Sequence, residues 1–124
     1  MITDINQIEK TLRDILKSQT PPLRVRKDTA GVLEVCGTKE TMQGKQKVDG
    51  YYFASVVPKP KDIRLYFFPI YTHVDQYANI SEETRKALKG KSCFHIKNLS
   101  PEMESEIKEM VKLGVELYQK DKLI

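Results

Sequence analysis

The two residues with the most distinctive chemistry are Cys93 and His95, which lie two positions apart in the segment SCFHIK. On a strand, positions i and i+2 project from the same face, so both side chains would leave one surface side by side. A thiolate and an imidazole are ligands for a metal such as zinc, which needs further ligands to reach four. Cys36 and His73 are the other candidates, but nothing in the spacing brings them to Cys93. Parallel projection also makes a nucleophile–base hydrogen bond awkward, so we favour a packed thiol beside a half-exposed imidazole.

A basic segment, TRKALKGKS, precedes this strand and could contact phosphate through Arg85, Lys86, Lys89 and Lys91. It lacks the Gly-x-x-x-x-Gly-Lys-Ser/Thr spacing of a P-loop. Cationic side chains also stabilise the C-terminal end of a helix, because the last carbonyl groups there carry partial negative charge. We favour this structural role, and binding of nucleic acid through the basic stretches stays a less favoured alternative.

Aromatic residues concentrate on one predicted hairpin. They are Tyr51, Tyr52, Phe53, Tyr66, Phe67, Phe68 and Tyr71. Strand alternation gives both faces of the hairpin aromatic side chains, whereas most sheets pack their rings into one core. Two helices cover only one face, so the other face would keep a pocket wall or a stacking platform.

The open face of the sheet is therefore the predicted binding site. Its candidate ligand-binding residues are Tyr52, Arg64, Tyr66, Phe68 and His95. The arginine among the rings makes a small anionic or aromatic ligand, or a protein partner, the expected occupant. No nucleophile–base–acid set is visible, so we predict a non-enzymatic protein without catalytic residues, resident metal or cofactor.

The element that opens the chain is an amphipathic helix. Ile5, Ile8, Leu12, Ile15 and Leu16 recur at helical spacing. A threonine–aspartate pair before them supplies the N-cap, a glutamine three residues later could complete a capping box, and two prolines end the helix.

The later elements alternate between strand and helix patterns. We expect strands at 23–27, 31–37, 51–57, 63–70 and 92–97, one or two short helices within 73–90, and a long helix after residue 100. Residues 38–50 are expected to form a turn-rich or flexible connection, which could include a short edge strand. Ser81 and Ser100 are the predicted N-caps, and Gly90 the predicted stop of the short helix. This order predicts an α+β fold, an antiparallel β-sheet with the N- and C-terminal helices packed on one face.

Size and composition place these elements in one domain, residues 1–124. No apolar run is long enough to span a membrane, and the first ten residues lack a secretory pattern. Two cysteines do not form a disulfide framework, so we expect a reduced, cytoplasmic protein. The net charge of +4 slightly favours an anionic partner.

Residues 50–120 resemble the YdhG-like family of small bacterial domains of unknown function. The matching residues are Phe53-Ala54, Lys61 through Tyr66, and Lys91-Ser92 through Phe94 and Ile96. The family's fold is similar to frataxin, so the resemblance implies a frataxin-like sandwich. One member is regarded as an iron chaperone, so it also implies metal handling as an alternative function. Carboxylates on the first helix would serve that role, and here they are Asp4, Glu9 and Asp14.

Overall fold

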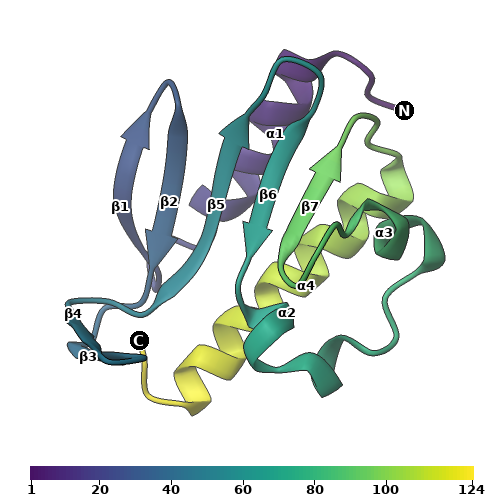
Figure 1. Ribbon diagram of the computed structural model, residues 1–124. Coiled ribbons are helices and arrows are strands. Elements are labelled where there is room, and N and C mark those ends of the chain that lie inside the picture. Colours follow the sequence, from purple (N-terminus) through teal and green to yellow (C-terminus); the bar gives the residue numbers. More distant parts are fainter.

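The computed structural model describes the whole chain, residues 1–124, and its centre is a five-stranded antiparallel sheet in the order β1-β2-β5-β6-β7. The strands are β1 (Arg24–Thr29), β2 (Val32–Cys36), β5 (Tyr52–Pro58), β6 (Ile63–Phe67) and β7 (Cys93–Ile96). The helices α1 (Ile5–Lys17) and α4 (Pro101–Lys120) lie behind this sheet in Figure 1, and no helix lies in front of it. The predicted α+β class, with both terminal helices on one face, is confirmed.

Local signals set the ends of both long helices. Asp4 caps α1 by accepting a hydrogen bond from the Asn6 amide at 3.0 Å, so the expected cap forms without the reciprocal glutamine contact. Ser100 caps α4 through the Met103 amide at 3.0 Å, and Pro101 takes the first helical position.

The face of the sheet that packs against the helices is apolar. Its strand positions pair as Val35 with Ala54, Val56 with Leu65, and Leu65 with Phe94. These side chains join the buried stripes of α1 and α4 in one core cluster of 24 residues. Burial of this surface is the main force that holds the helices to the sheet.

Gly114 lies where α4 packs tightly against the sheet. A Cβ atom at this position would lie 2.9 Å from Cζ of Phe53 and 3.1 Å from Cγ of Pro69. The absence of a side chain on α4 thus gives room to the Phe53 ring, which itself packs edge-on against Phe67 and Tyr118.

Three short helical segments join β6 to β7. They are α2 (Pro69–Thr72), the 3₁₀ turn η1 (Val74–Tyr77) and α3 (Glu82–Ala87). Ser81 caps α3 as expected, but the helix ends at Ala87 rather than at Gly90, which lies beyond it with a positive φ of 98°. Glu106 of α4 accepts hydrogen bonds from the amide and hydroxyl of Ser81, at 2.8 and 2.7 Å, and so fixes α3 to α4.

Residues 38–50, expected as a turn-rich connection, fold into a separate two-stranded sheet. Its strands are β3 (Thr41–Gln43) and β4 (Gln46–Val48). The C-terminal end of the chain lies beside this hairpin in Figure 1, and the Leu123 carbonyl accepts a hydrogen bond from the Thr38 amide at 3.0 Å. The last residues are therefore tied to the loop that follows β2.

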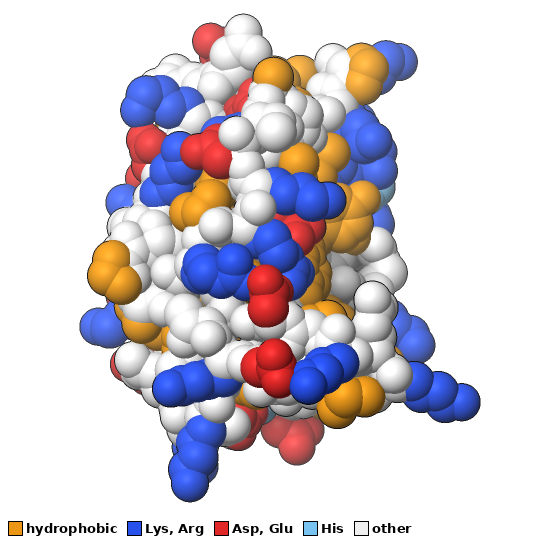
Figure 2. Space-filling view, turned by 90° about the vertical axis from the view of Figure 1, so that its left-hand side faces the viewer, with side chains coloured by type: hydrophobic (Ala, Val, Ile, Leu, Met, Phe, Trp, Pro, Cys, Tyr) orange, Lys and Arg blue, Asp and Glu red, His pale blue; other side chains and the backbone are white.

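The two edges of the sheet are protected differently. The β1 edge has a bulge between Val25 and Lys27, and Figure 2 shows basic and acidic side chains interspersed over it. The Asp28 carboxylate forms ion pairs with two residues of α1, Arg13 at 3.2 Å and Lys17 at 2.8 Å. At the opposite edge, residues 88 and 89 cover part of β7, through a bridge to Phe94 and a hydrogen bond from the Lys89 amide to the Cys93 carbonyl. No helix has the length and apolar composition that would let it cross a membrane.

Candidate functional site

The face opposite the helices carries polar and aromatic side chains from every strand. Ser55 lies between Glu34 and Tyr66 in one row across the sheet, and Tyr66 pairs with Cys93. In the next row Arg64 pairs with His95. The five predicted binding residues are all half-buried: Tyr52, Arg64, Tyr66, Phe68 and His95.

These five residues do not form one pocket, because they divide between the two ends of β6. Arg64 and His95 lie toward the β5–β6 turn, whereas Phe68 follows the other end of the strand, beside Tyr52. Tyr66 lies between them. None of the cavities is lined by Tyr52, Tyr66 or Phe68. The rings therefore form a surface, and the concave part of the site is at the Arg64 end.

The Arg64 end is strongly basic. A shallow cavity of about 360 Å³ is lined by Lys59, Pro60, Lys61, Asp62, Arg64 and Lys97. We call its four cations, Lys59, Lys61, Arg64 and Lys97, the cationic corner. No carboxylate lies within ion-pair distance of the three lysines, whereas most other basic residues of the sheet are paired.

Asp62 holds the Arg64 guanidinium of this corner in place. It is only 6% exposed, and its carboxylate accepts a hydrogen bond from Nε of Arg64 at 3.0 Å. That bond raises the pKa of Arg64 above its ordinary value. Nδ1 of His95 lies 3.9 Å from the other carboxylate oxygen. Since only Nε of Arg64 is engaged, its two Nη groups stay free to donate to a ligand.

A second shallow cavity of about 440 Å³ continues from the cationic corner along β7. It shares Asp62 and Lys97 with the first cavity and adds His95, Lys86 and Lys89. Part of the predicted basic segment thus reaches the same concave surface as Arg64. Its sequence distance from Arg64 hid this connection, which the antiparallel pairing of β6 with β7 creates.

At the other end of β6, three rings form what we call the aromatic row: Tyr52, Phe68 and Tyr71. Neighbouring ring centroids are 5.7 and 5.6 Å apart. Tyr71 is 49% exposed, and Nζ of Lys91 lies 5.4 Å from its ring centroid. Burial raises the pKa of Tyr52 to about 12, and its hydroxyl lies 2.7 Å from Oγ of Ser55. The Tyr52 hydroxyl is therefore neutral at pH 7, and the row has a cation at its exposed end.

Cys93 and His95 share the open face of β7 as the alternation predicts. Burial raises the pKa of the Cys93 thiol, and the neighbouring Tyr66 hydroxyl lowers it less. The thiol is therefore not activated as a nucleophile. No group of three or more His, Cys, Asp or Glu side chains lies close enough to hold a metal ion. Arg24 and Arg26 pair with Asp49 and Glu34, so their charges do not reach the cationic corner.

His73, which has no partner visible in the sequence, is held between two side chains. Oγ1 of Thr72 lies 2.8 Å from its Nδ1, and Oδ2 of Asp121 lies 2.8 Å from its Nε2. Hydroxyl, imidazole and carboxylate occur in this order in hydrolases. No cavity borders these three residues, so the arrangement ties α2 to the end of α4.

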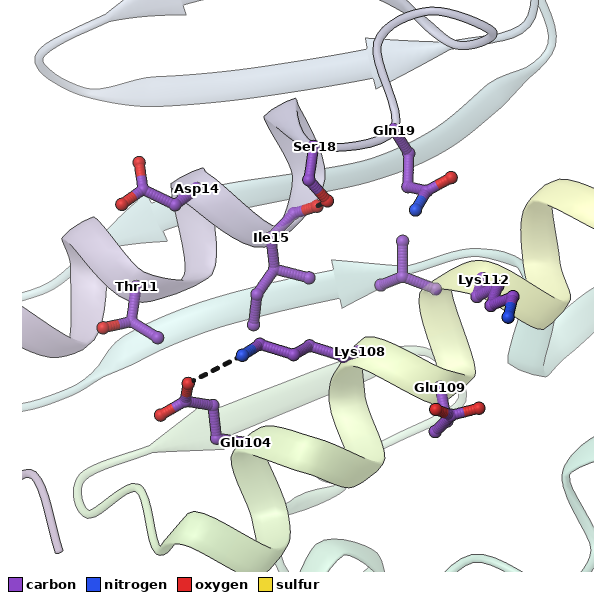
Figure 3. A pocket seen from close by; sticks show the side chains of 10 residues that line it. Thr11, Asp14, Ile15, Ser18, Gln19, Glu104, Lys108, Glu109 and Lys112 are labelled. Atoms are coloured by element: carbon purple, nitrogen blue, oxygen red, sulfur yellow. Dashed lines mark hydrogen bonds and ion pairs between the residues drawn. The ribbon is translucent and has the colours of Figure 1, made fainter.

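The largest cavity, about 470 Å³, is a groove between α1 and α4 on the far side of the sheet. Figure 3 shows Thr11, Asp14 and Ile15 of α1 facing Glu104 and Lys108 of α4 across it. Lys108 pairs with Glu104 at 3.1 Å and Asp14 with a lysine of its own helix at 2.8 Å, while the remaining charges on the walls of the groove, Glu109 and Lys112, are of opposite sign. It therefore offers a ligand less free charge than the cationic corner.

Comparison of the chain with protein-family models, with curated proteins and with solved structures finds no match. The resemblance to the YdhG-like family stays a prediction.

Proposed function

We propose that this protein is a non-enzymatic binding domain that holds an anionic ligand on the open face of its sheet, at the cationic corner. The supporting observation is the convergence of Lys59, Lys61, Arg64 and Lys97 on one cavity that contains a single carboxylate. Like charges so close together repel one another in the free protein. A bound anion would remove that repulsion, so the cluster favours a negatively charged occupant.

The geometry supports a ligand with a phosphate or carboxylate group. Asp62 fixes the Arg64 guanidinium through Nε, which leaves the two Nη groups in the fork that matches two oxygens of one anion. The exposed lysines would add charge without fixed geometry. The protein would thus recognise anions by one oriented guanidinium inside a positive field.

Two free thiols, Cys36 and Cys93, support the proposal of a reducing, cytoplasmic setting. A metal-chaperone role gains no comparable support, because no site with three potential ligands is present. A protein partner would use the same open face, and an acidic segment would fit the same cations.

The test is a titration of ¹⁵N-labelled protein with inorganic phosphate and pyrophosphate at low salt, followed by NMR. We expect the largest shifts at the amides of the cationic corner and a loss of most binding in the double variant Lys61→Gln/Lys97→Gln. The control is Lys112→Gln, which neutralises an exposed lysine on α4. Shifts spread evenly over all surface lysines, or equal binding by both variants, would reject the site.

A further inference from the structure

We propose that the anion held on the open face is the backbone of a single-stranded nucleic acid, whose bases stack on the aromatic row. This inference rests on the proposed function and gives its ligand a class. It depends on a second set of side chains, the rings of Tyr52, Phe68 and Tyr71, that a simple anion would not use.

The two parts of the face have complementary chemistry. Proteins that bind single strands combine a basic groove for the phosphates with aromatic side chains for the bases. Here the groove is formed by the cationic corner and its extension to Lys89, whereas Lys86 beside it pairs with Glu82 at 3.5 Å and Glu83 adds a carboxylate to the same cavity. The stacking surface is the aromatic row, with Tyr71 as its most exposed ring and Lys91 beside it.

The spacing of the two parts fits a short strand. Arg64 and Phe68 are four residues apart along β6 and its extension, which is about 13 Å at the rise of a β-strand. The charge spacing of about 3.4 Å per strand in a duplex would place about four nucleotides over that length, and an extended single strand, whose phosphates lie farther apart, places fewer. Tyr66 lies between the two parts on the same face. One strand could therefore contact the cationic corner and the aromatic row together.

The distribution of charge indicates where the phosphates of the bound nucleic acid would lie. On the β1–β2 half of the open face, Arg26 pairs with Glu34 at 2.6 Å and Arg24 with Asp49 at 2.9 Å. Lys27 of the edge strand β1 forms no ion pair, but the unpaired cations that share one cavity, Lys59, Lys61 and Lys97, lie on the β6–β7 half. Phosphates would thus follow β6 and β7. As in sheets that stack bases on one face while helices cover the other, the rings lie on the side away from α1 and α4, but only Tyr52 is on a strand, and Phe68 and Tyr71 come from the start of α2.

A duplex fits this surface less well. Paired bases keep their faces stacked inside the helix, so half-buried rings on a sheet reach only unpaired bases. The open face also lacks a helix or protruding ribbon that would enter a groove. A membrane of anionic lipids would use the cations without needing the aromatic row.

The test is fluorescence anisotropy with a labelled ten-nucleotide single strand of mixed sequence, in DNA and RNA forms, between 50 and 200 mM salt. Four phosphate contacts predict a slope of about −3 for log K against log salt. Lys61→Gln should make the slope shallower by about 0.7. Lys112→Gln on α4 is the control and should leave both affinity and slope unchanged.

Tyr71→Leu separates stacking from charge. Loss of the ring on which one base stacks should weaken binding at least about fivefold, with the salt slope unchanged. The chain has no tryptophan, so tyrosine fluorescence can be followed directly. The oligonucleotide should quench it by stacking, and polyphosphate should not. Since Tyr71 is half exposed, the variant should keep its fold, which circular dichroism checks.

Each outcome has a defined meaning. If polyphosphate of equal charge binds as tightly and Tyr71→Leu has no effect, the anion site stands and the nucleic-acid inference fails. Preference for a duplex, or binding only to vesicles containing phosphatidylserine, overturns it too. If no polyanion binds at 50 mM salt, both this inference and the proposed function are wrong.

Discussion

The contact between Gly114 and Phe53 allows a quantitative prediction for Gly114→Ala. Alanine in place of glycine inside a helix is normally worth about 1 kcal/mol in favour of folding. At this position the new methyl group would lie 2.9 and 3.0 Å from two ring atoms of Phe53 and 3.1 Å from Pro69. Overpacking of a core typically costs about 1–3 kcal/mol, so the net result should be a loss of about 1 kcal/mol.

The assay is urea unfolding followed by circular dichroism, with Phe53→Leu as a second background. Leucine lacks the two ring atoms that the alanine methyl would meet, so Gly114→Ala should there be neutral or stabilising by up to about 1 kcal/mol. The two substitutions should thus show a coupling energy of about 1–2 kcal/mol. A higher unfolding midpoint for Gly114→Ala in the wild-type background would refute the close packing of α4 on β5.

The polar contacts give three further expectations. Tyr118→Phe removes a hydroxyl that donates to a β5 carbonyl and should cost about 1–2 kcal/mol in thermal unfolding, and no loss would contradict this bond. Burial raises the pKa of Glu106, but hydrogen bonds from Thr84 and Ser81 outweigh it and lower the pKa overall. The stability this gives is complete above about pH 4.3 and is lost as the pH falls further. The stability difference between wild type and Glu106→Gln should therefore shrink from pH 7 to pH 3, and a constant difference would be inconsistent. Because burial raises the pKa of Cys93, iodoacetamide should alkylate it at pH 7 more slowly than a free cysteine, as mass spectrometry would show.

The elements with strong periodicity were predictable from the sequence. The apolar spacing from Ile5 to Leu16 predicts α1, and the alternation in β6 places Leu65 toward the helices and Arg64 on the opposite face. Both predictions are confirmed because burial of one stripe or one face dictates the pattern. The β3–β4 hairpin was missed because its three-residue strands carry no buried face that would produce such a pattern.

The candidate site was predictable in part. Alternation accounts for Arg64, Tyr66 and His95, whereas Tyr52 reaches the open face through the bulge in the β2–β5 pairing. The role of Asp62 was not predictable in this way, since the sequence places it in a proline-rich turn. Its spacing two residues before Arg64 was the available signal, because such positions share a face of a strand. The contact of His73 with Asp121 spans 48 residues, and no local pattern encodes a contact of that kind. Lys59 and Lys61 are neighbours in one turn, but Lys97 joins them only because β6 and β7 pair.

The protected edges of the sheet have a consequence for how the molecule behaves in concentrated solution. Strand β5 is rich in aromatic and aliphatic residues and carries no charge, features of segments that form amyloid when a growing fibril can add to them. In the native fold it is an interior strand, and a second molecule would have to approach through β1, where the bulge breaks the register and Lys27 repels its own copy. Fibril growth would first require β1 and β2 to detach, so the resistance of this protein to fibrillation should follow the stability of that outer hairpin.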